Sequence, residues 1–175
     1  MNESIKIALL GAGTVGGGVV RALSMNAEQI MARAGAPIEI KTILVRDAKK
    51  YRSELSGITL TDNFDAIIHD KEISIVVEVM GGIHPAKDYM LRAMAAGKHV
   101  VTANKDVIAE YLTELYAAAN ENGVDFLYEA SVGGGIPIIK PLKECLTANR
   151  ITEVMGVVNG TTNYMLTKMT EKHIS

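Results

Sequence analysis

Apolar residues along this chain form short continuous runs that alternate with stretches of helical spacing. The continuous runs predict five strands, at residues 5–10, 38–45, 73–80, 98–103 and 124–130. Spacing of three and four residues predicts helices at residues 14–34, 84–97 and 104–123. Strands that alternate with helices over short connections favour an α/β fold with a doubly wound parallel sheet.

The pattern changes after three consecutive glycines, Gly133 to Gly135. Residues 136–149 favour a helix, residues 150–160 a strand, and residues 161–175 a helix that the chain end interrupts. We therefore expect a first domain at residues 1–135. Residues 136–175 are expected to begin a second domain of the α+β class.

Composition narrows the partners. Of the 175 residues, 48% are hydrophobic and 22% charged, as is ordinary for a globular protein. The net charge of −2, without a basic block, argues against nucleic-acid binding, and no apolar run approaches the ~20 residues of a membrane span. The single cysteine, Cys145, fits a reducing compartment. We expect a cytoplasmic protein that binds small molecules.

A glycine-rich turn follows the first predicted strand and opens the first predicted helix. Its sequence is Gly11-Ala12-Gly13-Thr14-Val15-Gly16, a G-x-G-x-x-G pattern. In this context Gly11 permits the tight turn, Gly13 lets a pyrophosphate approach, and Gly16 lets helix and strand pack closely. Thr14 and Val15 open the helix, whose N-terminus favours an anion. The pattern predicts a Rossmann-type dinucleotide-binding domain.

The residues that end the second predicted strand bear on which dinucleotide binds. They are Val45, Arg46 and Asp47. A carboxylate here suits the ribose 2′-hydroxyl of NAD, whereas an arginine suits the 2′-phosphate of NADP. Both residue types are present. Arg46 comes first and favours NADP, with NAD as the alternative.

The next two predicted strands end at the same edge of the sheet, where ligands bind in such folds. Gly81 follows the third strand, Thr102 lies near the end of the fourth, and Lys105 lies in the first turn of the next helix. We take these three as candidate cofactor contacts and Lys105 as the candidate catalytic residue. A cation in the first turn of a helix opposes the helix dipole, which is weak support for a ligand role. A solvated surface lysine is the alternative.

The triple glycine follows an acidic residue, Glu129, at the end of the fifth predicted strand. If the chain there is extended, alternate carbonyls point the same way, so Val132, Gly134 and Ile136 can aim three oxygens at one point. Together with Glu129 they would suit a hard, weakly held cation. A flexible loop between domains is the alternative.

Four motifs, "GAGTVG", "TANKD", "EASVGGGIPII" and "NGTTNYML", closely resemble homoserine dehydrogenase in this order. The resemblance runs from Ile5 to Met165. It implies an NAD(P)-dependent oxidoreductase that interconverts L-homoserine and L-aspartate 4-semialdehyde, and a homodimer in the intact protein. It also implies a sodium-like cation on the four predicted ligands and a substrate contact at Gly160 and Thr161.

The chain is shorter than this family's members. The resemblance implies that the substrate-binding acids and the main proton-transferring lysine lie beyond Ser175, so the chain alone is expected to be inactive. A sugar or inositol dehydrogenase is an alternative, although "GGGIP" and "NGTTNY" do not fit that group. If the chain is complete, a dinucleotide-binding module without chemistry describes it better, and a fragment without ligand affinity is a further alternative.

Overall fold

The computed structural model describes residues 3–53, 55–157 and 159–173. Its centre is a parallel sheet of six strands in the order β3-β2-β1-β4-β5-β6. The strands are β1 (Ile5–Leu10), β2 (Ile38–Leu44), β3 (Thr59–Thr61), β4 (Ile73–Glu78), β5 (His99–Thr102) and β6 (Phe126–Leu127). This is the strand order of dinucleotide-binding folds, so the prediction of a Rossmann-type doubly wound sheet is confirmed.

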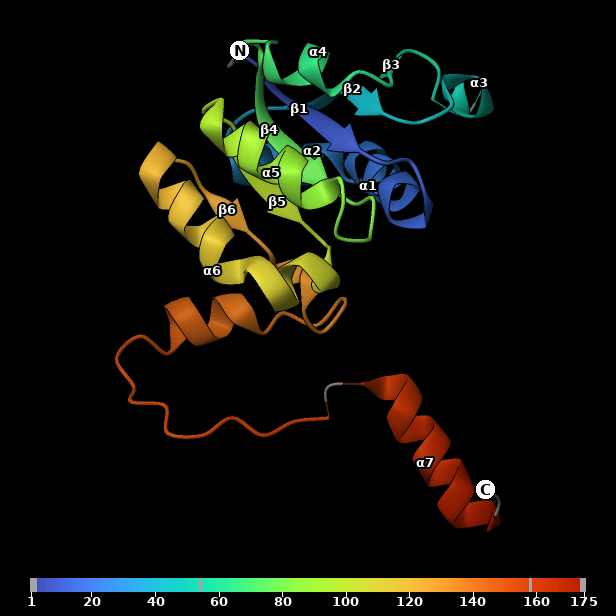
Figure 1. Cartoon of the computed structure of the whole chain (residues 1–175), viewed down its shortest axis with the longest axis vertical. Coiled ribbons are helices and arrows are strands. Elements are labelled where there is room, and N and C mark those ends of the chain that lie inside the picture. The colour runs from blue at the N-terminus through green and yellow to red at the C-terminus, as the bar shows by residue number, and fades with distance from the viewer. Residues whose placement is uncertain (1–2, 54, 158, 174–175) are drawn as a thin grey trace. The chain divides into compact units, whose positions relative to one another are not determined.

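Helices connect the strands and cover both faces of the sheet. They are α1 (Thr14–Met25), α2 (Ala27–Ala34), α3 (Ala48–Tyr51), α4 (Phe64–Ile68), α5 (Ala86–Ala95) and α6 (Lys105–Asn122). The strand order runs in one direction from β1 to β3 and in the other from β4 to β6. Right-handed crossovers then place α1 and α2 on one face, and α5 and α6 on the other (Figure 1).

The core lies where the central strands meet these helices. Leu9 of β1, Val76 of β4 and Val100 of β5 are completely buried, as are Met90 of α5 and Leu115 of α6. Strands covered on both faces need continuous apolar runs, which is why these strands were visible in the sequence.

The helix expected at residues 14–34 is two helices. The chain leaves helical geometry at Asn26, where both the backbone N–H and the side-chain amide donate to the Ala22 carbonyl. Asparagine readily bonds to nearby backbone in this way, which ends one helix and begins the next. None of the helices in the described part of the chain has the length and apolarity needed to cross a membrane.

The chain divides into two compact units, residues 1–131 and 132–175. In the second unit, the helix expected at 136–149 is shorter: residues 139–145 are helical, with a π-helical turn at Pro141–Cys145, and α7 spans Gly160–Lys172. The expected strand at 150–160 is wrong for its described residues before α7, which have no regular structure; residue 158 lies outside the described residues. A strand forms only beside a hydrogen-bonded partner strand, and the described part of this unit contains no paired strands.

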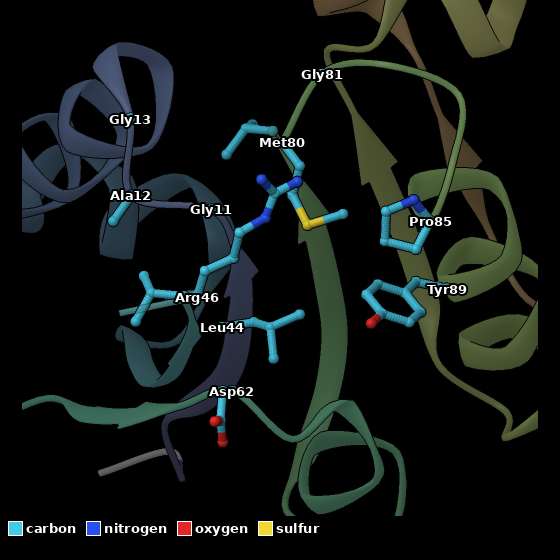
Figure 2. Close-up of a pocket in the computed structure, with 12 residues that line it drawn as sticks. Gly11, Ala12, Gly13, Leu44, Arg46, Asp62, Met80, Gly81, Pro85 and Tyr89 are labelled. Atoms are coloured by element: carbon cyan, nitrogen blue, oxygen red, sulfur yellow. The ribbon is translucent and has the colours of Figure 1, made fainter. Parts of the chain in front are cut away.

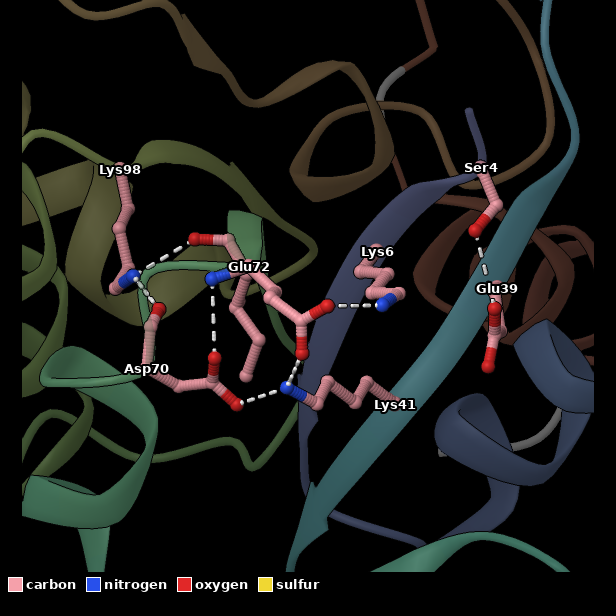
Figure 3. Close-up of polar contacts among 8 residues, drawn as sticks. Ser4, Lys6, Glu39, Lys41, Asp70, Glu72 and Lys98 are labelled. Carbon is pink, nitrogen blue, oxygen red and sulfur yellow. Dashed lines mark hydrogen bonds and ion pairs between the residues drawn. The ribbon is translucent and has the colours of Figure 1, made fainter. Parts of the chain in front are cut away.

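Charged residues hold the amino-terminal edge of the sheet together (Figure 3). Glu72, just before β4, forms ion pairs with Lys6 of β1 and Lys41 of β2. Asp70 pairs with Lys41 at 2.6 Å. Lys98 is buried, and its ammonium donates to the carbonyls of Asp70 and Ile73 at 2.8 and 2.7 Å. These contacts connect the turn before β4 to β1, to β2 and to the residue before β5, at the edge opposite the carboxyl ends of the strands.

Candidate functional site

A cavity of about 520 Å³ lies at the carboxyl edge of the sheet, within the first unit (Figure 2). Its volume is in the range of small-molecule sites. The glycine turn after β1, the end of β2, the residue after β3, the loop after β4 and the start of α5 line it. The lining residues are Gly11, Ala12, Gly13, Leu44, Val45, Arg46, Asp62, Val79, Met80, Gly81, Pro85 and Tyr89.

The glycine turn is built for close approach of an anion. Gly13 caps α1 without a side chain, the first turn of α1 contains no acidic residue, and a Cβ on Gly13 would meet open space. Free N–H groups at a helix N-terminus with open space before them suit a phosphate. This cradle fits the pyrophosphate of a dinucleotide.

The other two glycines of the motif are required for packing. Gly11 has a φ of +105°, and a Cβ there would lie 3.2 Å from the Val79 carbonyl. A Cβ on Gly16 would lie 2.3 Å from the Gly11 carbonyl oxygen. Side chains at these two positions would push the turn away from β4 and from α1.

The two charged residues after β2 have different surroundings. Arg46 extends into the cavity (Figure 2). The Asp47 side chain instead accepts from the Lys49 N–H at 2.9 Å and caps α3. Asp62, after β3, adds a carboxylate to the cavity. The cavity therefore offers a guanidinium for a phosphate and a carboxylate that would repel one.

Apolar and aromatic side chains supply the remaining lining. Leu44, Met80, Pro85 and Tyr89 belong to this part of the lining. The Tyr89 ring stacks on Phe64, with ring centroids 4.1 Å apart, which fixes its orientation. An apolar slot beside a phosphate cradle suits a nucleotide base.

The candidates at the end of β5 and the start of α6 are not among the residues that line the cavity. Thr102 is buried and its hydroxyl donates to Glu78 Oε2 at 2.6 Å. Asn104 caps α6 by accepting from the Val107 N–H at 3.2 Å. The Lys105 side chain is 81% exposed, and its ammonium is 3.8 Å from Asp106 Oδ1.

The residues predicted to hold a cation are not in the conformation assumed for them. Glu129 begins a 3-10 helix, Glu129–Ser131, rather than ending a strand. In the second unit, Gly133 and Gly134 have φ angles of +72° and +62°, and the Ile136 N–H donates to the Gly133 carbonyl at 3.2 Å. The alternating carbonyls of an extended chain are therefore absent here, and this part of the reasoning was wrong. The cation itself stays a prediction.

Gly160 and Thr161, the predicted substrate contacts, form the first turn of α7 in the second unit. Asn159 caps this helix and accepts from the Thr162 N–H at 2.8 Å. The Thr162 N–H is therefore already hydrogen-bonded within the helix cap.

Comparison with known proteins identifies the family. A family model described as "Homoserine dehydrogenase, NAD binding domain" matches residues 11–129, and one described as "Homoserine dehydrogenase" matches residues 137–175. The chain belongs to the homoserine dehydrogenase family. This confirms the resemblance found in the four motifs and sets aside the sugar dehydrogenase alternative.

Individual homoserine dehydrogenases agree with this assignment. The enzyme of Bacillus subtilis is 48% identical over 168 residues, which cover 95% of this chain and 39% of that protein. The crystal structure of a homoserine dehydrogenase from Thiobacillus denitrificans matches with a TM-score of 0.91 and 48% identity, over 97% of this chain and 39% of that one. A hyperthermophilic archaeal homoserine dehydrogenase in complex with NADPH matches with a TM-score of 0.79 and 26% identity, over 97% of this chain and 57% of that one. The chain spans 39% of the length of the curated Bacillus relative.

Sequence reasoning located part of the cavity lining. The structure brings together Gly11, Gly13, Val45, Arg46 and Gly81 around it, with Thr14, Val15 and Gly16 in the adjoining first turn of α1. Sequence reasoning did not name six of the lining residues, Leu44, Asp62, Val79, Met80, Pro85 and Tyr89. Asp62 had no signal, because β3 before it is only three residues long. Tyr89 was visible only as one polar-tipped residue on a predicted helix.

Proposed function

We propose that this chain is the nucleotide-binding portion of an NAD(P)-dependent homoserine dehydrogenase, which interconverts L-homoserine and L-aspartate 4-semialdehyde. The observation that carries the proposal is the open cradle at Gly13, at the N-terminus of α1, beside a cavity of about 520 Å³. Membership in the homoserine dehydrogenase family supports the substrate pair.

In this proposal the chain binds and orients the nucleotide. The α1 N-terminus holds the pyrophosphate, and the apolar lining of the cavity, which includes Leu44, Met80, Pro85 and Tyr89, packs against the rest of the nucleotide. The bound nicotinamide supplies hydride transfer to or from the alcohol carbon of the substrate. The protein contributes position and electrostatics around that step.

NADP is the proposed preferred nucleotide. Arg46 lines the cavity at the end of β2, while the carboxylate of Asp47 is engaged in capping α3. A guanidinium can bind a 2′-phosphate through two parallel hydrogen bonds. The NADPH complex of the archaeal relative supports this choice.

Further roles are proposed from the family resemblance. Lys105 would bind cofactor or substrate oxygen by charge and is the proposed catalytic residue of this chain. Gly160 and Thr161 would contact substrate, and a sodium-like cation would bind Glu129, Val132, Gly134 and Ile136. The intact protein would be a homodimer.

Two measurements test the proposal. Fluorescence titration of the chain should give saturable binding of NADPH, and a flat titration with both NADPH and NADH would refute nucleotide binding. The intact protein should reduce NADP⁺ with homoserine and not with sugars or inositol. The 175-residue chain alone should bind nucleotide without this turnover, since it spans 39% of its Bacillus relative.

A further inference from the structure

A buried carboxyl group lies at the carboxyl end of β4, one residue before the cavity lining begins. Glu78 is the last residue of β4 and is completely buried. Among the described residues it forms no ion pair. An acidic group buried without a cation is expensive unless hydrogen bonds satisfy it. A fold retains such a group where its contacts have a use.

Both side-chain oxygens of Glu78 accept hydrogen bonds from residues at the carboxyl ends of the central strands. The Met80 N–H donates to Oε1 at 2.7 Å, and the Thr102 hydroxyl donates to Oε2 at 2.6 Å. Met80 belongs to the loop after β4, and Thr102 is the last residue of β5. One side chain therefore holds the ends of two neighbouring strands.

Hydrogen bonds extend from Thr102 to the next helix and back to the loop after β4. The Asn104 N–H donates to Thr102 Oγ1 at 3.0 Å, and the Asn104 side-chain amide donates to the Gly82 carbonyl at 2.7 Å. The Asn104 carbonyl oxygen of the same side chain caps α6. The contacts form a closed circuit from Glu78 through Thr102 and Asn104 to Gly82.

The loop inside this circuit needs to be held. Gly81 and Gly82 both have positive φ angles, +76° and +72°, and a Cβ added to either residue would meet open space. Two consecutive glycines in the left-handed region carry many alternative conformations, so an unrestrained loop would lose much entropy on binding a ligand. The circuit fixes Met80 and Gly82 on either side of Gly81, which lines the cavity.

We propose that Glu78 is a positioning residue that fixes the nicotinamide half of the nucleotide site. Doubly wound folds of this order consist of two mononucleotide-binding halves. The β1–β3 half contains the glycine cradle and Arg46, and so takes the adenosine half of the dinucleotide. The ends of β4 and β5, which Glu78 joins, then face the nicotinamide half. This inference rests on the proposed nucleotide binding and adds a residue to it.

The test compares two ligands in the full chain. One is NADPH, and the other is 2′-phospho-ADP-ribose, which lacks the nicotinamide. Thr102→Val keeps the shape of the side chain and removes the hydroxyl, whereas Thr102→Ser keeps the hydroxyl. Glu78→Gln leaves one oxygen for the two donors. Val76→Ala, two residues earlier on β4 and equally buried, controls for loss of stability alone.

We expect Thr102→Val and Glu78→Gln to weaken NADPH binding by about tenfold, the effect of a buried polar group that loses its partner. Both variants should bind 2′-phospho-ADP-ribose within about twofold of wild type. Thr102→Ser, which keeps the hydroxyl, should bind NADPH as the wild type does. Val76→Ala should change neither affinity while lowering the melting temperature.

Three outcomes would overturn the inference. The first is an equal loss of affinity for the two ligands in Thr102→Val, and the second is no loss of affinity for either ligand. The third is equal affinity of the wild-type chain for NADPH and for 2′-phospho-ADP-ribose. In each of these cases nucleotide binding itself can still hold. If the wild-type chain binds neither ligand, the proposed function fails with the inference.

Discussion

Gly13 and Gly16 belong to one motif but meet different constraints, which a pair of substitutions separates. At Gly13 a Cβ would enter open space, and its φ of −72° is accessible to alanine. Gly13→Ala should therefore change the free energy of unfolding by less than about 1 kcal/mol. Because the added methyl enters the phosphate cradle, NADPH affinity should fall more than about tenfold.

For Gly16→Ala we expect the opposite result: a larger effect on the free energy of unfolding than on NADPH affinity. Its Cβ would lie 2.3 Å from the Gly11 carbonyl oxygen, so the turn must shift, at roughly 1–3 kcal/mol of stability. Thermal unfolding and NADPH titration of both variants check the pair. A large loss of stability in Gly13→Ala, with nucleotide affinity retained, would contradict the cradle.

Arg46 and Asp62 line the same cavity with opposite charges, so each should affect the choice of nucleotide in its own direction. Arg46→Ala should lower NADPH affinity by about 10- to 100-fold, since charge-assisted hydrogen bonds to the 2′-phosphate are lost. NADH affinity should change little. Asp62→Asn should raise the NADPH-to-NADH affinity ratio, because a carboxylate that repels the phosphate is removed. Equal losses for both nucleotides in Arg46→Ala would exclude the phosphate contact.

At the scale of elements, the strands of the central sheet were predictable because their burial on both faces leaves a continuous apolar run. β1 has the bounds that its apolar run predicts. β3 escaped detection because three residues, Thr59–Thr61, carry no period of their own and form a strand only beside β2. The apolar residues around Val154 gave a strand-like pattern without a neighbour, and the prediction was wrong there. The apolar pattern of a sequence indicates which residues are buried, whereas the pairing of strands depends on the rest of the fold.

The same limit applies to the site. The glycine turn after β1 is a local feature and could be read from its motif. The circuit of Glu78, Thr102, Asn104 and Gly82 joins residues up to 24 positions apart, whose contacts exist only once β4 and β5 are paired. Sequence reasoning named Thr102 as a cofactor contact and gave no sign of its partner Glu78.

The ion pairs at the amino-terminal edge of the sheet predict a pH dependence of stability. Hydrogen bonds from Lys41, and then from Lys6, lower the pKa of Glu72 from 4.5 to about 2. A carboxyl group whose pKa is lower in the folded state stabilises the fold above its unfolded pKa. That contribution should be lost as the pH falls from about 4.5 to about 2.

Thermal unfolding of wild type and Glu72→Gln between pH 7 and pH 2 measures this effect. The wild type should be more stable at pH 7, and the difference should vanish toward pH 2. Glu110→Gln serves as the control, because Glu110 is exposed and makes no ion pair among the described residues. A difference that stays constant with pH would assign the effect to packing instead of charge.

At the scale of the whole molecule, the two units differ in what they bury. All six strands, α1 to α6 and the hydrophobic core lie in residues 3–131. No described residue of the second unit is buried. Large apolar side chains there are exposed instead, among them Met155 at 84%, Val157 at 75% and Tyr164 at 64%. The first unit therefore contains the burial that stabilises a fold, and the second contains apolar surface.

This difference predicts that a chain ending at Ser131 folds by itself. It should unfold in one cooperative transition, since no core residue is removed. It should bind 2′-phospho-ADP-ribose within about threefold of the 175-residue chain, because the cradle and Arg46 lie in the first unit. Loss of the exposed apolar residues should also reduce self-association, which sedimentation of both chains would measure.

A chain ending at Asn122 is the control. It lacks β6 and the buried rings of Phe126 and Tyr128, and should unfold broadly or aggregate. If the chain ending at Ser131 behaves like this control, the second unit stabilises the first, and the core of residues 3–131 does not suffice.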